Sequence, residues 1–212
     1  GNNDETWSIA WGDVDGDGDL DLAAGNWEAA NKVYLVENGE LHASNSWDTD
    51  DADKSGSIAW GDVDGDGDLD LAVGNVSETN KVYFNLGGIL QTDAELLWTS
   101  GDSDDTFSVA WGDVNGDGYL DLAIGNGQQS NKVYLNQGGI LQQDNFWDLG
   151  DTEETTSVAW GDVDGDGDLD LAVCTDGRSK RVYLNQVGIL QQDVFWYIGD
   201  TEETTSVAWG DV

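Results

Sequence analysis

The sequence predicts an all-β protein made of four four-stranded antiparallel units and the first strand of a fifth. A nine-residue acidic stretch starts at Asp13, and equivalent stretches start at Asp62, Asp113 and Asp162. A fifth copy begins at Asp211 and is cut off at Val212, so the period is 49 to 51 residues. Each complete period holds four short apolar runs separated by Gly, Asn and Asp residues. Four short antiparallel strands at a period of 40–50 residues are typical of β-propeller blades. We therefore expect a β-propeller or a segment of one.

The repeat also predicts where each blade begins and ends. The expected blades are residues 1–50, 51–101, 102–150 and 151–200, and residues 201–212 are expected to form the first strand of a further blade. In the third unit the apolar runs and turn residues predict strands over residues 107–112, 120–125, 132–136 and 140–147. No segment keeps a 3.6-residue apolar period, so no helix is expected.

The composition excludes several classes of partner. The chain has 212 residues, with 44 acidic against 7 basic side chains, which gives a net charge of −37. Nucleic acids and anionic membrane surfaces require basic patches, so neither is an expected partner. No apolar run is long enough to span a membrane. Without an initiator Met or a signal peptide, the sequence is expected to be a processed or excised piece.

The acidic stretch has the composition of a calcium-binding loop. Calcium prefers six to eight oxygen ligands from a flexible, carboxylate-rich loop. We number each loop from its first aspartate, so that Asp13 is position 1 of the first loop. Positions 1, 3, 5 and 9 are acidic, except that position 3 of the third loop is Asn115, which still offers an oxygen. Position 6 is glycine, as a sharp turn requires. Position 7 is expected to offer its backbone carbonyl and to leave its side chain free, because the third loop has Tyr119 there.

Positions 1, 3, 5, 7 and 9 of the four complete loops are therefore the predicted metal ligands. They are Asp13, Asp15, Asp17, Asp19 and Asp21; Asp62, Asp64, Asp66, Asp68 and Asp70; Asp113, Asn115, Asp117, Tyr119 and Asp121; and Asp162, Asp164, Asp166, Asp168 and Asp170. The loop is not an EF-hand, because position 12 is apolar where an EF-hand has a bidentate glutamate. Magnesium is less suited, since it demands tight octahedral geometry. We expect about four Ca²⁺ ions, one in each complete repeat.

The strand–loop–strand segment from Ser157 to Val173, and residues 131–136 with the glycine pair that follows them, resemble the FG-GAP/VCBS repeat. That family includes the calcium-binding blades of integrin α-subunit propellers and many secreted bacterial surface proteins. The resemblance covers essentially the whole chain. It implies a β-propeller with calcium in the hairpin between the first two strands of each blade, an extracellular setting, and a role in adhesion or carbohydrate binding. The chain departs from the family in its number of blades and in the turn from Cys174 to Arg181.

These features predict a non-enzymatic extracellular module with a structural or adhesive role. The alternative is a calcium-dependent glycan-binding propeller. It would read sugars with the polar turns between the second and third strands (residues 26–31, 75–80 and 126–131), together with Trp27 and the acidic loops at 151–154 and 200–203. An enzyme is not expected, because the adjacent pairs Glu153/Glu154 and Glu202/Glu203 lie in loops and the single His42 has no partner for catalysis.

Four smaller features complete the expectations. Cys174 lies in an apolar run and is expected to be buried. The tryptophans of the fourth strands (Trp47, Trp98, Trp147 and Trp196) are expected to pack between blades. Asn75-Val-Ser77 is a glycosylation sequon on a turn expected to be exposed. The surplus strand at residues 205–212 repeats a first strand without a sheet of its own, and an unpaired strand edge favours pairing with another chain. Self-association into a ring or filament is therefore expected, with a closed four-bladed monomer as the alternative.

Overall fold

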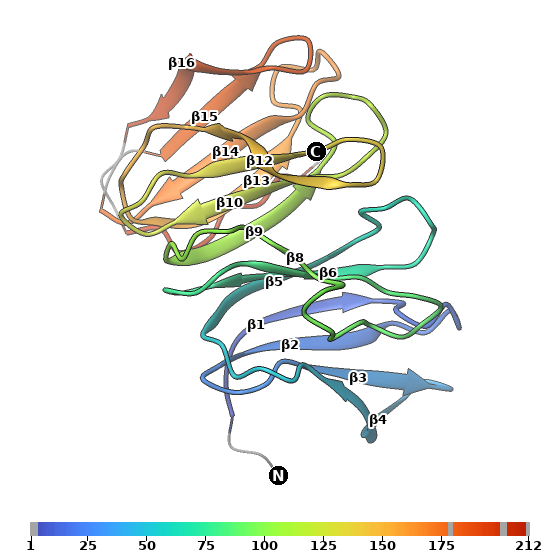
Figure 1. Cartoon of the computed structure of the whole chain (residues 1–212). Helices are drawn as coiled ribbons and strands as arrows, with labels where there is room; N and C mark the ends of the chain where they lie inside the picture. The colour runs from blue at the N-terminus through green and yellow to red at the C-terminus, as the bar shows by residue number, and fades with distance from the viewer. Residues whose placement is uncertain (1–3, 178–179, 200–202, 211–212) are drawn as a thin grey trace. The chain divides into compact units, whose positions relative to one another are not determined.

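The computed structural model describes residues 4–177, 180–199 and 203–210, and Figure 1 shows their arrangement into antiparallel sheets. Within these ranges every regular element is a β-strand. Among the same residues, no helix is present that could cross a membrane. The prediction of an all-β propeller fold with four-stranded blades is confirmed.

Each sheet is a simple meander in which consecutive strands are neighbours. The first sheet is β1 (Glu5–Gly12), β2 (Asp21–Trp27), β3 (Lys32–Glu37) and β4 (Glu40–Asp48); the second is β5 (Ser55–Gly61), β6 (Asp70–Asn75), β7 (Lys81–Tyr83) and β8 (Trp98–Thr99); the third is β9 (Thr106–Gly112), β10 (Asp121–Asn126), β11 (Lys132–Asn136) and β12 (Leu141–Asp148); the fourth is β13 (Thr155–Gly161), β14 (Asp170–Thr175), β15 (Lys180–Asn185) and β16 (Leu190–Ile198). The four strands predicted for the third unit agree with the observed ones to within one residue at each end.

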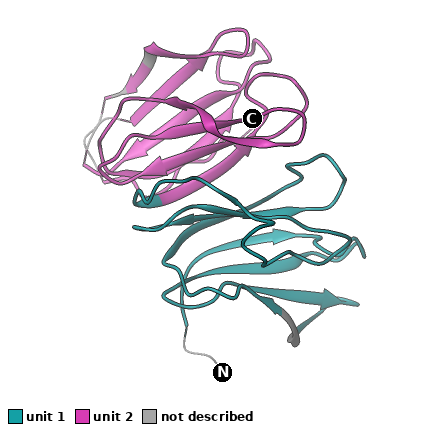
Figure 2. Ribbon diagram, viewed as in Figure 1, with its two compact units in different colours: residues 1–106 teal, residues 107–212 magenta. Residues whose placement is uncertain are grey.

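The chain divides into two compact units, residues 1–106 and 107–212, coloured separately in Figure 2. Each unit contains two of the sheets. In the first unit, Val14, Ala23 and Val33 of the first sheet pack against Ile58 and other apolar residues of the second. Of the four tryptophans predicted to pack between blades, Trp47 does so here, because its ring lies edge-on to that of Tyr83 at 5.8 Å. For Trp196 the prediction is wrong, because its side chain is 47% exposed.

The second unit has the equivalent core. Val114, Ala123 and Val133 of the third sheet pack against Val158 and Leu171 of the fourth. The second strand of each sheet lies between two strand neighbours, and β6, β10 and β14 are buried along their whole length. This explains why their sequences read as continuous apolar runs without polar alternation.

The second sheet departs from the regular pattern at its last strand. The second repeat has two more residues between Leu90 and Trp98 than the other repeats have between the equivalent leucine and tryptophan. These two residues account for the one repeat spacing of 51. The extra length forms a turn in which the Leu96 N–H bonds to the Asp93 carbonyl at 2.8 Å. As a result β8 is reduced to Trp98–Thr99, whereas β4, β12 and β16 have eight or nine residues.

Residues 203–210, described here as the tail, belong to no sheet. The strand expected here therefore has no ladder partner among the described residues; Asp211 and Val212 lie outside them. The tail nevertheless lies against the fourth sheet. The Val207 N–H bonds to Ser157 Oγ at 3.2 Å, and the Trp209 indole N–H bonds to the Ala159 carbonyl at 3.1 Å.

Candidate metal centres

The acidic loops connect the first and second strands of each sheet, as predicted, and their own side chains fix the turn. In the first loop, Asp13 Oδ2 accepts the N–H of Gly18 at 3.0 Å. Asp15 Oδ1 accepts the N–H of Asp17 at 3.2 Å, and Asp17 Oδ1 accepts the N–H of Asp19 at 2.8 Å. The corresponding bonds are present in the other three loops. Gly18 has φ 96°, which confirms the glycine requirement at position 6.

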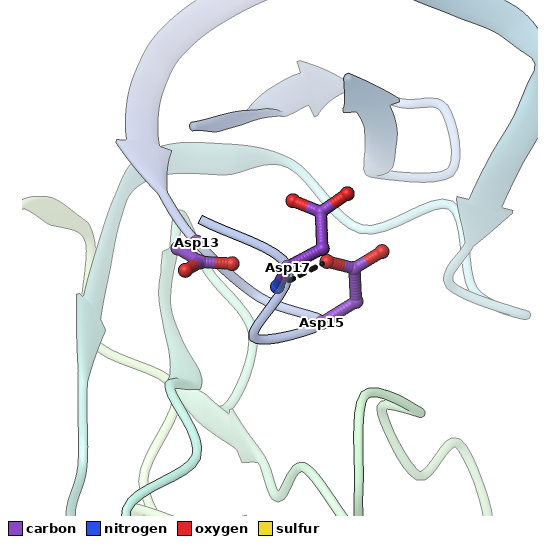
Figure 3. Close-up of side chains that lie close together, drawn as sticks. All are labelled: Asp13, Asp15 and Asp17. Carbon is purple, nitrogen blue, oxygen red and sulfur yellow. Dashed lines mark hydrogen bonds between the residues drawn. The ribbon is translucent and has the colours of Figure 1, made fainter. Parts of the chain in front are cut away.

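The carboxylates at positions 1, 3 and 5 gather around one point, as Figure 3 shows for the first loop. In the first, second and fourth loops, one oxygen from each of the three residues lies within 4.8 Å of the others. The third loop has the same backbone turn with the amide of Asn115 at position 3. Asp13 Oδ1 is buried and has no hydrogen-bond partner among the described residues. The donor set therefore fits a hard cation that takes carboxylate oxygens.

Electrostatics at position 3 reflect this crowding. Partial burial raises the pKa of Asp15, and the neighbouring carboxylates at positions 9, 5 and 1 raise it further against the hydrogen bond from Asp17. The pKa of Asp64 is raised by burial and by Asp66 and Asp62. A divalent cation among these oxygens would remove the repulsion that raises both pKa values.

The aspartate at position 9 has a different environment from the other predicted ligands. Asp70 is completely buried, and its two carboxylate oxygens accept the N–H of Val63 at 2.9 Å and the N–H of Asn85 at 2.8 Å. Position 9 makes the same two bonds in every sheet. This residue ties the loop to the end of the third strand, so its first role is to brace the hairpin. Any contact of its oxygens with a cation would be additional to these bonds.

The side chain at position 7 also has a structural partner, contrary to the expectation that it is free. Asp68 Oδ2 accepts the N–H of Gly87 at 2.8 Å, and Asp168 Oδ2 accepts that of Val187 at 2.8 Å. Asp19 makes the equivalent bond to Gly39 at 3.2 Å. The carboxylate at position 7 therefore holds the turn between the third and fourth strands, while its backbone remains the proposed source of a metal ligand.

The comparison with known families decides what these repeats are. The model described as "FG-GAP-like repeat" matches residues 13–73, 62–124 and 113–173, which together span most of the chain. The protein belongs to the FG-GAP-like repeat family. No curated protein matches the sequence. The FG-GAP repeat identity predicted from the strand–loop–strand segments is thus confirmed.

The solved structures agree on the fold. One similar chain is from the crystal structure of BBS1N in complex with ARL6DN, soaked with mercury, with a TM-score of 0.58 and 12% sequence identity. The match covers 90% of this chain and 53% of the other, so the FG-GAP chain spans about half the length of that neighbour. At this identity the similarity concerns the fold alone.

A residue missed at the sequence level links consecutive FG-GAP repeats. Asn85, at the end of the third-strand region of the second sheet, donates from Nδ2 to the carbonyl of Val14 in the preceding loop at 2.7 Å. Asn185 makes the same bond to Val114 at 2.7 Å. The signal was present in the sequence, because Asn recurs at this position in the second, third and fourth repeats; the first repeat has Val36 instead.

The turns considered for sugar recognition are mostly occupied by structural bonds. Asn26, Asn75 and Asn126 are buried, and the N–H of each bonds to the side-chain oxygen of an asparagine five residues later. These turns also bond to the connection between consecutive sheets, as in the 3.1 Å bond from the Glu28 N–H to the Asp53 carbonyl. The expectation of an exposed sequon is wrong, because the Asn75 amide is buried and donates to the Thr79 carbonyl at 2.8 Å.

The remaining candidates have structural surroundings. Glu153 accepts a 2.8 Å hydrogen bond from Arg181, and Glu154 lies beside it in the connection before β13. Glu203 is exposed, whereas Asp200 to Glu202 lie outside the described residues. His42 lies on β4, which is an edge strand. Cys174 is buried in β14, as predicted.

The buried aspartates predict how the stability of the metal-free FG-GAP chain depends on pH. Burial raises the pKa of Asp70 to about 7 and that of Asp121 to about 6, despite the hydrogen bonds that each accepts. Because the folded chain binds these protons more tightly than the unfolded chain, the stability that these two groups contribute is fully present below about pH 4 and is lost as the pH rises through 7. We expect the urea midpoint of chelator-treated protein to be higher at pH 5 than at pH 8.

The matched control for this pH effect is Asp70→Asn, which removes one titrating group. Its urea midpoint should vary less between pH 5 and pH 8 than that of the unmodified chain. A midpoint that rises with pH in the chelator-treated protein would contradict the assignment. Against the effect of burial, hydrogen bonds from Lys81 and Tyr83 lower the pKa of Asp51, and a hydrogen bond from Ser130 lowers that of Asp148. The stability that these two groups contribute is lost only as the pH falls below about 4.

Proposed function

We propose that this FG-GAP repeat protein is a non-enzymatic, calcium-binding scaffold in which about four Ca²⁺ ions each fasten the hairpin between the first two strands of a sheet. Positions 1, 3 and 5 supply side-chain oxygens, position 7 supplies its backbone carbonyl, and position 9 supports the loop and is the remaining candidate ligand. The observation that carries the proposal is the convergence of three carboxylates within 4.8 Å in repeated, identically folded loops.

The charge of the chain supports the same proposal. Four calcium ions would bring +8 to a net charge of −37 and leave −29. Self-repulsion destabilises the compact state of a strongly charged protein, so part of the benefit of binding is global rather than confined to the loops. Isothermal titration with calcium tests the proposal directly. About four ions per chain are expected, and no binding at millimolar calcium would overturn it.

The third loop is expected to be the weakest site. Its Asn115 contributes an oxygen without a charge, and the number of charged ligands is one determinant of calcium affinity. We expect Asn115→Asp to tighten that site about 10-fold, with Asp117→Asn in the same loop as the opposite control. The measurement is a calcium titration of both variants against the unmodified chain. A third site that already equals the other three would contradict this expectation.

An extracellular structural or adhesive role is part of the proposal. Weak calcium modules outside cells are tuned to dissociation constants of about 10⁻⁴–10⁻³ M, where free calcium is near millimolar. A binding constant in this range would support that setting, whereas nanomolar affinity would favour a site that is loaded inside cells.

A calcium-dependent glycan-binding propeller remains the second candidate, supported by one observation. Trp7 and Trp27 are stacked with their ring centroids 4.3 Å apart, and Trp7 is exposed. Exposed aromatic rings can stack on sugar faces, although the buried asparagines of the neighbouring turns are not available to read hydroxyl groups. A glycan array probed with Trp7→Ala beside the unmodified chain distinguishes the two candidates.

A further inference from the structure

The first sheet has an outer face that its counterparts in the second and fourth sheets bury. This front face consists of Ile9, Trp11, Leu20 and Leu41, with exposed fractions of 60%, 54%, 58% and 49%. The residues at the first and last of these positions are only about 5% exposed in the second and fourth sheets, where they are Ile58, Leu90, Val158 and Leu190. In each unit those residues pack on the preceding sheet.

The contacts that bury the equivalent face are the same in both units. The indole N–H of Trp60 donates to the Ala10 carbonyl, and that of Trp160 donates to the Ala110 carbonyl, at 3.3 and 3.1 Å. Each indole lies over a glycine of the preceding sheet, Gly12 or Gly112, where a Cβ would come within 2.8 Å of the ring. A first strand therefore packs at a defined position on the sheet before it. We call this position the seat; it comprises the Ala10 carbonyl and Gly12 in the first sheet, and the Ala110 carbonyl and Gly112 in the third.

The fourth sheet carries such a seat, and the tail occupies it. Trp209 donates to the Ala159 carbonyl and lies over Gly161, while the Val207 N–H bonds to Ser157 Oγ. These contacts reproduce those that β5 and β13 make. The described residues of the tail correspond only to the first strand of a sheet. The fourth-strand Trp196 beside the seat is 47% exposed, whereas Trp47 and Trp147 pack against a following sheet.

We propose that the front face of one chain docks on the seat of the fourth sheet of a second copy, and that the tail competes for that seat. Ile9 and Trp11 would take the places of Val207 and Trp209. The contacts that the tail makes with the fourth sheet would then be replaced by equivalent contacts from the first strand of the second copy. Docking of a complete sheet would additionally bury Leu20 and Leu41, which the tail cannot replace. Burial of apolar surface favours this exchange. The contact is head-to-tail and can therefore extend to a chain of copies.

Two residues make this junction weaker than the internal ones. The first sheet has Val36 at the repeat position of Asn85 and Asn185, whose side chains donate to a carbonyl of the preceding loop. At the junction between copies, the equivalent bond to the carbonyl of Val163 would therefore be missing. The fourth sheet has Cys174 at the repeat position of Gly25 and Gly125 in the first and third sheets. A Cβ at either glycine would lie 2.9 Å from the first-strand residue that packs there, Ile58 or Val158, so the cysteine side chain would hinder the same packing between copies. An association that is weak and can be strengthened by single substitutions is therefore expected.

This inference rests on the proposed calcium scaffold through one contact. Gly88 of the second sheet lies against Asp15 of the preceding loop. A Cβ added to this glycine would be 3.2 Å from the Cα of Asp15. The equivalent turn of the first sheet contains Asn38, Gly39 and Glu40. Between copies this turn would meet the acidic loop that begins at Asp162, so bound calcium would reduce repulsion there and association should weaken in chelator.

The test is sedimentation velocity of the 212-residue chain over a range of concentrations in millimolar calcium. We expect the weight-average mass to rise with concentration. A chain ending at Gly199, which lacks the tail, should associate at about 10-fold lower concentration. Val36→Asn should tighten association about fivefold, as one added hydrogen bond would. The double variant Ile9→Asp, Leu41→Asp should remain monomeric.

The matched control is Ile140→Asp. Ile140 is 66% exposed, and its equivalents Ile89 and Ile189 are exposed as well, so this position is not part of the face that stacks between sheets. It should leave association unchanged. Calcium-dependent melting of every variant shows that it is folded. If calcium raises the melting temperature but no variant associates, this inference fails and the proposed function stands; if calcium changes neither, the proposed function fails.

Three further results would overturn the inference. Association that survives Ile9→Asp, Leu41→Asp would use another surface. Association that is lost on removal of the tail would show that the tail itself pairs with the second copy by strand exchange. A monomer at all concentrations in which Ile9 is protected from solvent would show that the face closes within one chain.

Discussion

Removing calcium is expected to lower the melting temperature of this protein by roughly 10–40 °C. A ligand present at 10- to 100-fold above its dissociation constant stabilises the folded state by about 1.4–2.7 kcal/mol per site. Four sites would together contribute about 6–11 kcal/mol, which is comparable to the whole stability of an ordinary domain. For a chain of this length, 1 kcal/mol corresponds to about 2–4 °C. The measurement is calorimetry in millimolar calcium and in excess EDTA.

A graded control separates site binding from a general effect of salt. The double variant Asp62→Asn, Asp162→Asn weakens position 1 in two of the four loops, so it should lose about half of the calcium-dependent shift. Magnesium at the same concentration should restore little of it, because the loops favour a larger and more loosely coordinated ion. Identical midpoints in calcium and EDTA would refute the scaffold role of the metal.

Replacing the buried aspartate at position 9 should be severely destabilising even without calcium. In Asp70→Asn, the amide can still accept one of the two N–H groups of Val63 and Asn85, but its NH₂ faces the other. A buried N–H without an acceptor costs about 1–3 kcal/mol, and the opposed donors add to this. We expect a loss of about 2–4 kcal/mol, measured by urea unfolding in EDTA at pH 5. At this pH Asp70, whose pKa burial raises to about 7, is protonated in the folded chain, and both of its oxygens can still accept an N–H.

The matched variant for this experiment is Asp66→Asn in the same loop. Asp66 is exposed, and the bond that it accepts from the Asp68 N–H can be kept by the amide oxygen. Its effect in EDTA should stay within about 0.5 kcal/mol, as for other surface substitutions. Equal losses for the two variants would mean that position 9 does not brace the hairpin.

The sequence was most informative where structure depends on neighbours along the chain. The hairpin strands of the third unit were predicted to within one residue because apolar runs and Gly or Asn breaks determine them locally. The turn of the acidic loop was likewise readable, since each carboxylate bonds to a backbone N–H two or five residues ahead.

The parts that were missed depend on partners distant in sequence. Position 9 bonds to a backbone N–H 15 residues later, and Asn85 bonds to a carbonyl 71 residues earlier. Nothing in local propensity reveals such pairs. The asparagines of the turns were misjudged for a related reason. Asn in a turn is ordinarily solvated, but here the connection between consecutive sheets covers these residues.

The hydrogen bonds inside each acidic loop have a consequence for how an ion would bind. Positions 1, 3 and 5 already hold the turn, and the aspartate at position 9 anchors its exit, so the chain does not have to become ordered when calcium arrives. Binding to a pre-organised loop loses little conformational entropy. We therefore expect calcium to raise stability with almost no change in the far-ultraviolet circular dichroism of the folded protein. The ion would act on the equilibrium between folded and unfolded chains rather than on the shape of the folded one.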